Sequence, residues 1–266
     1  MPVYINDVSV IAPGLVNKEQ ARSVLCGQNN WKYEQMPILK PEMLPANERR
    51  RTTPVIKLAL QCIQGLLRDY DDLQTLSTVF ASSDGDLEIV DKMCSALAED
   101  KKTVSPILFH NSVYNAPAGY WSIASRMSGA SISLSAGDAS FMCGLQETVT
   151  QVEVDGGTVL FVCYDYPAPP LLDVSRHFDY PLAIALRMGA EAEHKVLGTL
   201  TLDGPLNTQE KEISNSHCRN VSLEPLRTAL PVGSGLPLIE ALLRRARMQI
   251  ILPYLRNEKF RISISH

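Results

Sequence analysis

The sequence predicts an α/β protein in which helices cover both faces of a mixed central β-sheet. The first observation is that apolar periodicity alternates between strand-like and helix-like segments along most of the chain. The second is composition, because 45% of the 266 residues are hydrophobic and 20% are charged, which suits a chain with a sizeable buried core. We find no internal repeat in the sequence, and we therefore expect a single domain over residues 1–266.

Strand and helix segments follow one another in a regular order through the first two thirds of the chain. A strand over 3–13 alternates and stops at Pro13, and Asn17 and Gly27 then bracket a helix as its two caps. The following segments repeat this alternation, which is typical of layered α/β folds. We expect helices over 52–70, 86–100, 117–129 and 140–154, and strands over 76–83, 131–135 and 158–165.

The last third of the chain has a different pattern. Two apolar strands over 181–189 and 194–204 are separated by the short segment "AEAE", which favours an antiparallel hairpin that closes one side of the sheet. Residues 205–266 read as an embellished C-terminal segment. In that segment we expect a polar irregular loop over 205–231, a helix over 235–249 and an edge strand over 259–266.

Charge and cysteine usage limit the classes of function. The net charge of -4 gives no electrostatic reason to expect a nucleic-acid partner. The six cysteines are scattered without CxxC spacing, which is typical of reduced thiols in the cytosol. No stretch approaches the ~20 apolar residues of a membrane span, and no phosphate-binding glycine motif or metal-ligand spacing is present. We expect a cytoplasmic protein with no membrane span and no cofactor or metal.

Several phrases of the sequence together point to a known family. The most specific is "FHNSVYNAPAGYWSIA", and it is accompanied by "NERRRTTPVIKLALQC", "VFASSDGD" and "DGGTVLFVCYD". In these phrases, and in register over about residues 3–203, the chain resembles the N-terminal half of β-ketoacyl synthases. It resembles more closely a short ketosynthase-like family of bacterial aryl polyene and related pigment gene clusters. The resemblance implies a thiolase-like layered half-domain, with a mixed central sheet flanked by helices.

The stretch "SISLSAGDASFMCGLQETV" reads as a strand that turns through a glycine-containing elbow into a helix. In condensing enzymes of this family a cysteine lies at that turn, in a motif that reads roughly Thr-Ala-Cys, and the helix N-terminus stabilises its thiolate. Matching without a gap from the helix places Asp138, Ala139 and Ser140 on the motif. Matching from the strand places residues 135–137 there and requires an insertion in the helix. We prefer the first register, and neither supplies a cysteine.

The candidate site residues are grouped around this elbow. Ser140 is a candidate acyl acceptor and His110 its candidate base, while Asp138, Asn111 and Asn115 are candidate substrate contacts. Each of the two catalytic candidates also has a structural interpretation, which we favour: Ser140 as a helix cap and His110 as a buried loop histidine bonded to backbone. A serine hydroxyl needs an adjacent base to act as a nucleophile.

Three functions from different classes follow from the resemblance. The first, which we favour, is a ketosynthase-like protein without the condensing cysteine that acts as an accessory or partner subunit in carrier-protein-bound polyene or fatty acyl chain biosynthesis. Its expected partners are an acyl carrier protein, for which the run Arg49-Arg50-Arg51 offers a docking charge, and a full-length ketosynthase or a second copy of this chain. The alternatives are a serine-dependent acyltransferase or hydrolase using Ser140, and a non-catalytic module that binds an acyl chain.

Overall fold

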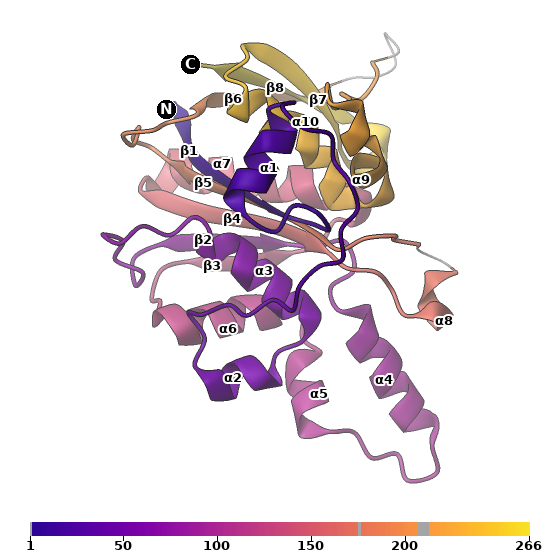
Figure 1. The fold of residues 1–266 in the computed structure, drawn as a ribbon. Coiled ribbons are helices and arrows are strands. Elements are labelled where there is room, and N and C mark those ends of the chain that lie inside the picture. The colour runs from indigo at the N-terminus through magenta and orange to yellow at the C-terminus, as the bar shows by residue number, and fades with distance from the viewer. Residues whose placement is uncertain (1, 175–176, 207–212) are drawn as a thin grey trace.

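The computed structural model describes residues 2–174, 177–206 and 213–266. Within these ranges a single eight-stranded sheet has the order β3-β2-β4-β5-β1-β6-β8-β7 (Figure 1). Strands β3, β2 and β4 are parallel to one another and every other pairing is antiparallel, so the predicted mixed sheet is confirmed. The strands are β1 Val3–Ile11, β2 Ser77–Ala81, β3 Ser131–Leu134, β4 Thr158–Asp165, β5 Leu182–Gly189, β6 Gly198–Leu206, β7 Met248–Pro253 and β8 Lys259–Ser265.

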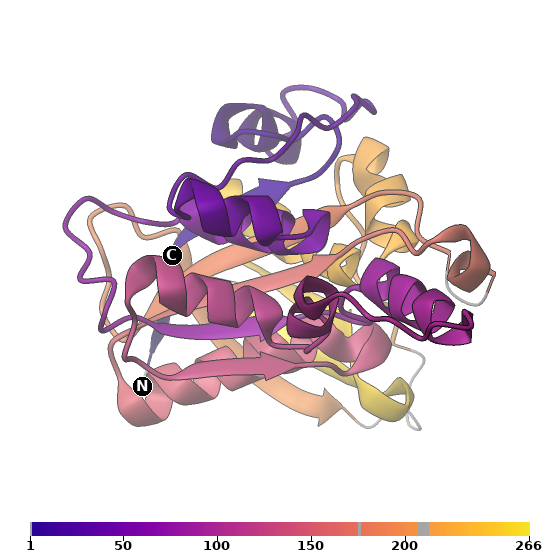
Figure 2. The same ribbon diagram turned by 90° about the horizontal axis from the view of Figure 1, so that it is seen from below.

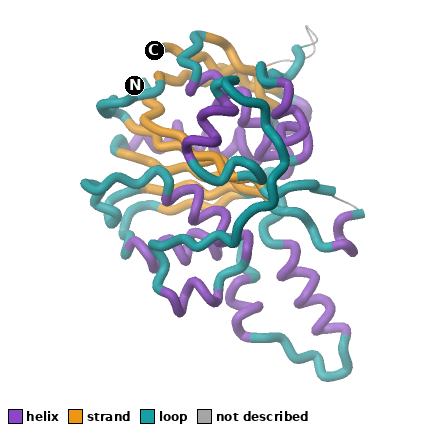
Figure 3. Tube along the Cα trace, viewed as in Figure 1, coloured by secondary structure: helices purple, strands orange, loops and turns teal. Residues whose placement is uncertain are grey.

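Helices connect these strands and cover the sheet on both sides (Figures 2 and 3). The predicted helices over the first two thirds of the chain are present, with short ones added between them. The α-helices are α1 Lys18–Leu25, α2 Ala46–Arg51, α3 Pro54–Gln64, α4 Leu87–Ala98, α5 Pro106–Asn111, α6 Ala116–Ser125, α7 Ser140–Asp155, α8 Pro170–Asp173, α9 Glu224–Ala229 and α10 Leu236–Leu243. Short 3-10 helices are η1 Gly137–Ala139, η2 Val221–Leu223, η3 Pro231–Gly235 and η4 Leu255–Asn257.

Two hydrophobic cores lie on opposite faces of the sheet. Along β4, Phe161 and Cys163 belong to the core under α1, α7 and α10, whereas Leu160 and Val162 belong to the core under α3 and α6. All four side chains are fully buried. Side chains of a strand alternate between faces, so an apolar strand of this kind needs a helix layer on each side. The central position of β4 therefore follows directly from its unbroken apolar sequence.

The predicted hairpin of the strands at 181–189 and 194–204 is wrong. Both strands exist, as β5 and β6, but β1 lies between them and pairs antiparallel with each. The register joins Ile11 to Ala183 on one edge of β1 and Val3 to Leu200 on the other. Strand β1 is buried along most of its length, and a strand of that kind needs a neighbour on both edges. Consecutive strands are only usually neighbours, and here the interior place goes to the N-terminal strand.

The C-terminal segment also differs from expectation. The strand predicted at the sheet edge is β8, which lies inside the sheet between β6 and β7, and the outer strand is β7. The predicted helix over 235–249 ends at Leu243, and β7 begins at Met248, because Arg245 has a left-handed backbone with φ of 53°. Of the predicted irregular loop, residues 207–212 lie outside the described residues, and its second half contains η2 and α9.

Helices α4 and α5 form a pair that extends away from the body of the molecule (Figure 1). Within each of these helices a single side chain is buried, Ile89 in α4 and Asn111 in α5. The pair leaves the sheet just after the end of β2 and returns through α6 to β3. In the described ranges, each helix is too short or too polar to cross a bilayer.

Candidate functional site

The strand-to-helix elbow lies where β3 ends and α7 begins, beside the carboxyl ends of β2 and β4. The chain turns through η1, in which Gly137 has a φ of +55°, a left-handed conformation that favours glycine. Ser140 is the first residue of α7, a helix of 16 residues. The elbow therefore presents Ser140 at the N-terminal end of a long helix, where the helix dipole is positive.

The Ser140 side chain is fully buried and bonded to the main chain. Its Oγ accepts a hydrogen bond from the Ala136 amide at 3.0 Å, and it has the carbonyl oxygens of Gly137 and Ser82 as acceptors at 2.7 and 3.1 Å. The hydroxyl carries one proton, which these two carbonyls share. Ser140 thus fastens the elbow to itself and to the loop after β2. The predicted helix-cap role of Ser140 is wrong, because the N-cap of α7 is Ala139 and the Ser140 hydroxyl bonds no amide of that helix.

Two further hydroxyls join the same loop to the elbow. The Tyr114 hydroxyl donates to the carbonyl oxygen of Ser82 and, at 2.7 Å, to that of Leu134. The Ser135 hydroxyl donates to the Ser83 carbonyl at 2.8 Å. Burial raises the pKa of Tyr114, so its phenol stays protonated and keeps donating. The loop after β2 is consequently held by three side chains, those of Tyr114, Ser135 and Ser140.

Asp165 is the carboxylate at the centre of this network. It ends β4, is almost completely buried, and accepts from the Ser83 amide at 2.8 Å, the Ser83 hydroxyl at 2.7 Å, the Ser82 hydroxyl at 3.3 Å and the Val232 amide at 3.1 Å. Burial raises the pKa of Asp165 to about 6 against the lowering effect of these bonds. Sequence analysis did not single it out, although an acidic residue closing the apolar run "TVLFVCYD" was the available signal.

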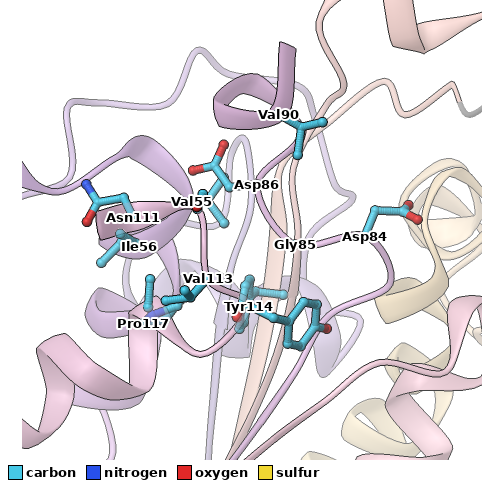
Figure 4. Close-up of a pocket in the computed structure, with 13 residues that line it drawn as sticks. Val55, Ile56, Asp84, Gly85, Asp86, Val90, Asn111, Val113, Tyr114 and Pro117 are labelled. Atoms are coloured by element: carbon cyan, nitrogen blue, oxygen red, sulfur yellow. The ribbon is translucent and has the colours of Figure 1, made fainter. Parts of the chain in front are cut away.

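A small cavity of about 70 Å³ lies next to the elbow, at the base of the α4 and α5 pair (Figure 4). Its wall combines apolar side chains of α3 and α6 with polar groups of the loop after β2. Asp86 lines it with one carboxylate oxygen, Oδ2, that has no hydrogen-bond partner, and burial raises the pKa of that carboxyl. Tyr114 lines the cavity and also bonds the elbow, so the two features adjoin.

The predicted contacts divide between the elbow and this cavity. Asp138 is exposed on the elbow, and Asn115 is exposed at the start of α6. Asn111 is buried in the cavity wall, where its amide donates to the Arg51 carbonyl at 2.8 Å and its oxygen accepts from the Tyr120 hydroxyl at 3.0 Å. These bonds account for one donor and the acceptor of the Asn111 amide. Substrate contact by the three residues remains a prediction.

His110 is exposed within α5, so the interpretation as a buried loop histidine is wrong. Its ring stands edge to face with Tyr120, with a centroid distance of 6.0 Å. Both His110 and Ser140 are described residues, and no hydrogen bond joins them. The bonds that Ser140 makes go to main-chain groups, which are not bases. The structure thus brings Ser140 and Asp138 together at the elbow and leaves His110 on another element.

Thiols lie near the elbow but on other positions. Cys143 is half-buried one turn further along α7, and burial raises its pKa. Cys163 is fully buried within β4, and burial raises its pKa well above the ordinary value. Residues 135–140 contain no cysteine. Among the described residues, no group of three or more His, Cys, Asp or Glu side chains is placed to hold a metal ion.

The two-sided sheet and the elbow that starts a buried helix define a thiolase-like, ketosynthase fold. The chain belongs to the family described as beta-ketoacyl synthase, N-terminal domain, whose model matches residues 25–247. The predicted family resemblance is thereby confirmed. No curated protein is similar enough in sequence to be matched.

Solved structures share this fold over nearly the whole chain. A ketosynthase (ApeO) in complex with its chain length factor (ApeC) from Xenorhabdus doucetiae is 24% identical, with a TM-score of 0.74, and 99% of both chains is covered. The ishigamide ketosynthase/chain length factor is 12% identical, with a TM-score of 0.71 and 99% of both chains covered. A type II PKS acyl-carrier protein in complex with its ketosynthase bound to the hexaketide is 13% identical, with a TM-score of 0.71 and 99% of both chains covered. At these identities the likeness is one of fold.

Proposed function

We propose that this chain is a non-condensing partner subunit that pairs with a ketosynthase in the carrier-protein-bound synthesis of polyene or fatty acyl chains. The observation that carries the proposal is the state of the elbow. Where the family's condensing enzymes have a cysteine, the preferred register gives Ser140, and its hydroxyl is buried and bonded to three main-chain groups. In this proposal the elbow keeps its structural role and has lost its nucleophile.

The chemistry of the hydroxyl supports this interpretation. An unassisted serine hydroxyl is a weak nucleophile at neutral pH and requires a base within hydrogen-bond reach. The proton of Ser140 points instead to the carbonyl oxygens of Gly137 and Ser82. Attack on a thioester would require breaking these bonds inside a packed core, without a group to receive the proton. Decarboxylative condensation on this chain alone is therefore excluded from the proposal.

The exposed surface of α4 and α5 supports the pairing. Large apolar side chains lie uncovered along the two helices and the turn that follows α5, with Phe109 the most exposed at 67%. Clusters of this kind on a soluble surface mark sites of protein association. The same side of the sheet ends in β3, a parallel edge strand with Ile132 exposed. The apolar side chains of this surface are Val90, Leu97, Ile107, Phe109 and Val113.

The comparisons support the kind of partner. Two of the solved structures with this fold are described as a ketosynthase with its chain length factor, and a third as a ketosynthase with an acyl-carrier protein. We propose the same two classes of partner here. For the acidic carrier, α2 offers Arg50 and Arg51, both exposed, and charges of this type steer association more than they add to affinity.

Co-expression with a ketosynthase of the same organism tests the proposal. We expect the two chains to co-purify as a defined complex in size-exclusion chromatography with light scattering. Phe109→Ser should weaken this complex about tenfold or more, because buried aromatic anchors dominate interfaces. Val154→Ser is the matched control, since Val154 is equally exposed but lies at the far end of α7. A monomer that ignores ketosynthases, or equal loss in both variants, would contradict the proposal.

Two other functions are separated by a second measurement. Intact-protein mass spectrometry after incubation with acyl-carrier or acyl-CoA donors would show a covalent adduct if Ser140 were an acyl acceptor, with His110 its candidate base. An adduct that Ser140→Ala abolishes would replace the partner-subunit proposal with an acyltransferase or hydrolase. Native mass spectrometry of the purified protein reports on the remaining function, a module that holds an acyl chain without chemistry.

A further inference from the structure

A second cavity lies away from the elbow, between the extended segment that follows α1 and the start of α3. Its volume is about 230 Å³. Met36, Ile38 and Leu39 of the extended segment line it. Lys57 of α3 and Tyr166, which follows β4, line it as well. The lining is therefore mainly apolar and includes two polar side chains.

Lys57 is the unusual member of this lining. It is half-buried, and within the described part of the chain its ammonium has neither an ion pair nor a hydrogen bond. Lys57 therefore has an unpaired positive charge to offer an anion. Two other lysines do have anionic partners: Lys18 pairs with Asp7 at 2.6 Å, and Lys92 pairs with Glu88.

The position of Lys57 in α3 also favours binding of an anion beside it. It lies in the first turns of α3, where the positive end of the helix dipole disfavours a cation. The first turn of α3 holds no acidic residue. No Asp or Glu side chain is among the described residues that line this cavity. An anion bound in the cavity of about 230 Å³ would interact with Lys57 and with the N-terminal end of α3.

The apolar lining defines the rest of the ligand. Ile38 is 81% exposed although it lines the cavity, and Met36 and Leu39 pack only partly against the core. These side chains offer apolar area that a hydrocarbon chain would cover. An engineered cavity of roughly 150 Å³ holds benzene. By that scale a cavity of 230 Å³ takes about nine non-hydrogen atoms.

We propose that this cavity binds a free medium-chain aliphatic carboxylate, with its head group on Lys57 and its chain along Met36, Ile38 and Leu39. The Tyr166 hydroxyl, which belongs to the same lining, is a second donor for the head group. The ligand differs from an acyl thioester, which has no negative charge to offer Lys57. The site is independent of the partner-subunit proposal, since none of its residues belongs to the elbow or to the α4 and α5 surface.

Titration calorimetry of the full chain with sodium octanoate tests the site. We expect saturable one-to-one binding with a Kd of about 1 mM or tighter. Lys57→Gln should weaken it about tenfold or more, because a charge-assisted hydrogen bond is lost. Ile38→Ser should weaken it severalfold through the chain, and its exposed position leaves folding intact. Lys101→Gln, at an exposed lysine in the loop between α4 and α5, should leave the Kd unchanged.

Neutral and short analogues separate the contributions of head group and chain. Octanol and the N-acetylcysteamine thioester of octanoic acid should bind at least tenfold more weakly than octanoate, and butyrate should show no saturable binding. The proposal is overturned by equal binding of octanoate and octanol, by absence of saturable octanoate binding, or by an unchanged Kd in Lys57→Gln. Circular dichroism melting curves of every variant establish that each is folded.

Discussion

At Ser140, one hydroxyl contacts three main-chain groups of the elbow and of the loop after β2. Ser140→Ala should lower the free energy of unfolding by about 1–3 kcal/mol, because it leaves the partly buried Ala136 amide without an acceptor. For a chain of this size that is a fall in Tm of roughly 2–10 °C. Thermal unfolding followed by circular dichroism measures it.

A matched variant distinguishes the elbow from an ordinary helix. Ser122 lies within α6 and donates only to the Gly119 carbonyl of its own helix. Ser122→Ala should change Tm by no more than about 2 °C, since alanine is the better helix former. Equal effects of the two alanine variants would show that the Ser140 bonds do not hold the elbow.

Asp165 makes stability depend on pH in an unusual direction. Its pKa is raised from the model-compound value of 3.8 to about 6, so between these values the folded state binds more protons than the unfolded state. The resulting stabilisation is complete below about pH 4 and is lost as pH rises through about 6. Asp165→Asn removes this contribution. The Tm of the wild type minus that of Asp165→Asn should therefore increase as pH falls from 7 to 5.

The comparison needs one control, because other carboxyl groups titrate over the same range. Asp100 is exposed at the end of α4, and the Tm difference between wild type and Asp100→Asn should stay constant from pH 7 to pH 5. If the Asp165→Asn difference were equally constant, the raised pKa of Asp165 would be wrong.

At the scale of elements, α7 and α6 respond oppositely to the same substitution. Gly144 lies on the buried face of α7, where an added Cβ would come within 2.4 Å of the Phe161 ring and 3.0 Å of the Ala81 Cβ. Gly144→Ala should therefore destabilise the fold by about 1–3 kcal/mol through overpacking. Gly119 in α6 has open space around it, and Gly119→Ala should stabilise by about 0.5–1 kcal/mol through helix propensity.

Urea unfolding of both variants measures the two effects in one experiment. The midpoint should fall for Gly144→Ala and rise for Gly119→Ala, with unchanged slopes. A rise in both would mean that helix propensity outweighs the contact of α7 with β4. That contact is what packs the elbow helix against the sheet.

The elements that sequence predicted well are those whose apolar pattern is local. The long stripe of α3 and the unbroken apolar run of β4 were both expected, and both are central in the fold. Pairing was harder, because it depends on residues far apart in the sequence. No pattern within residues 181–204 indicates that β1 lies between β5 and β6. Strand β7 was missed because its residues continue directly from an arginine-rich helix end.

The candidate site shows the same difference between local sequence patterns and long-range contacts. Ser140 is a candidate because a family motif marks the elbow, and Asn111 because it lies in the most specific phrase, and the site role of both stays a prediction. Asp165 was not found, since its partners Ser82, Ser83 and Val232 come from separate segments. Its importance is a property of the packed ends of β2 and β4. A buried carboxylate of this kind is visible only once those ends are placed together.

At the scale of the whole molecule, the sheet with its covering helices, which we call the body, differs in role from the extending α4 and α5 pair. The body encloses two cores and the bonded elbow. The pair contributes little to either core and carries the exposed apolar surface. Phe109→Ser should accordingly leave Tm nearly unchanged while it weakens association with a ketosynthase. A large loss of Tm would instead place Phe109 in the folding core.

The interior position of β1 has a consequence for how the protein is made. The two neighbours of this strand, β5 and β6, are translated long after it. At 5–20 residues per second, translation from Ala12 to Pro181 takes roughly 10–35 s. Throughout that interval both edges of an apolar strand are open to wrong partners on other nascent chains. Slow translation or scarce chaperones should therefore cause aggregation of this protein before β5 and β6 emerge.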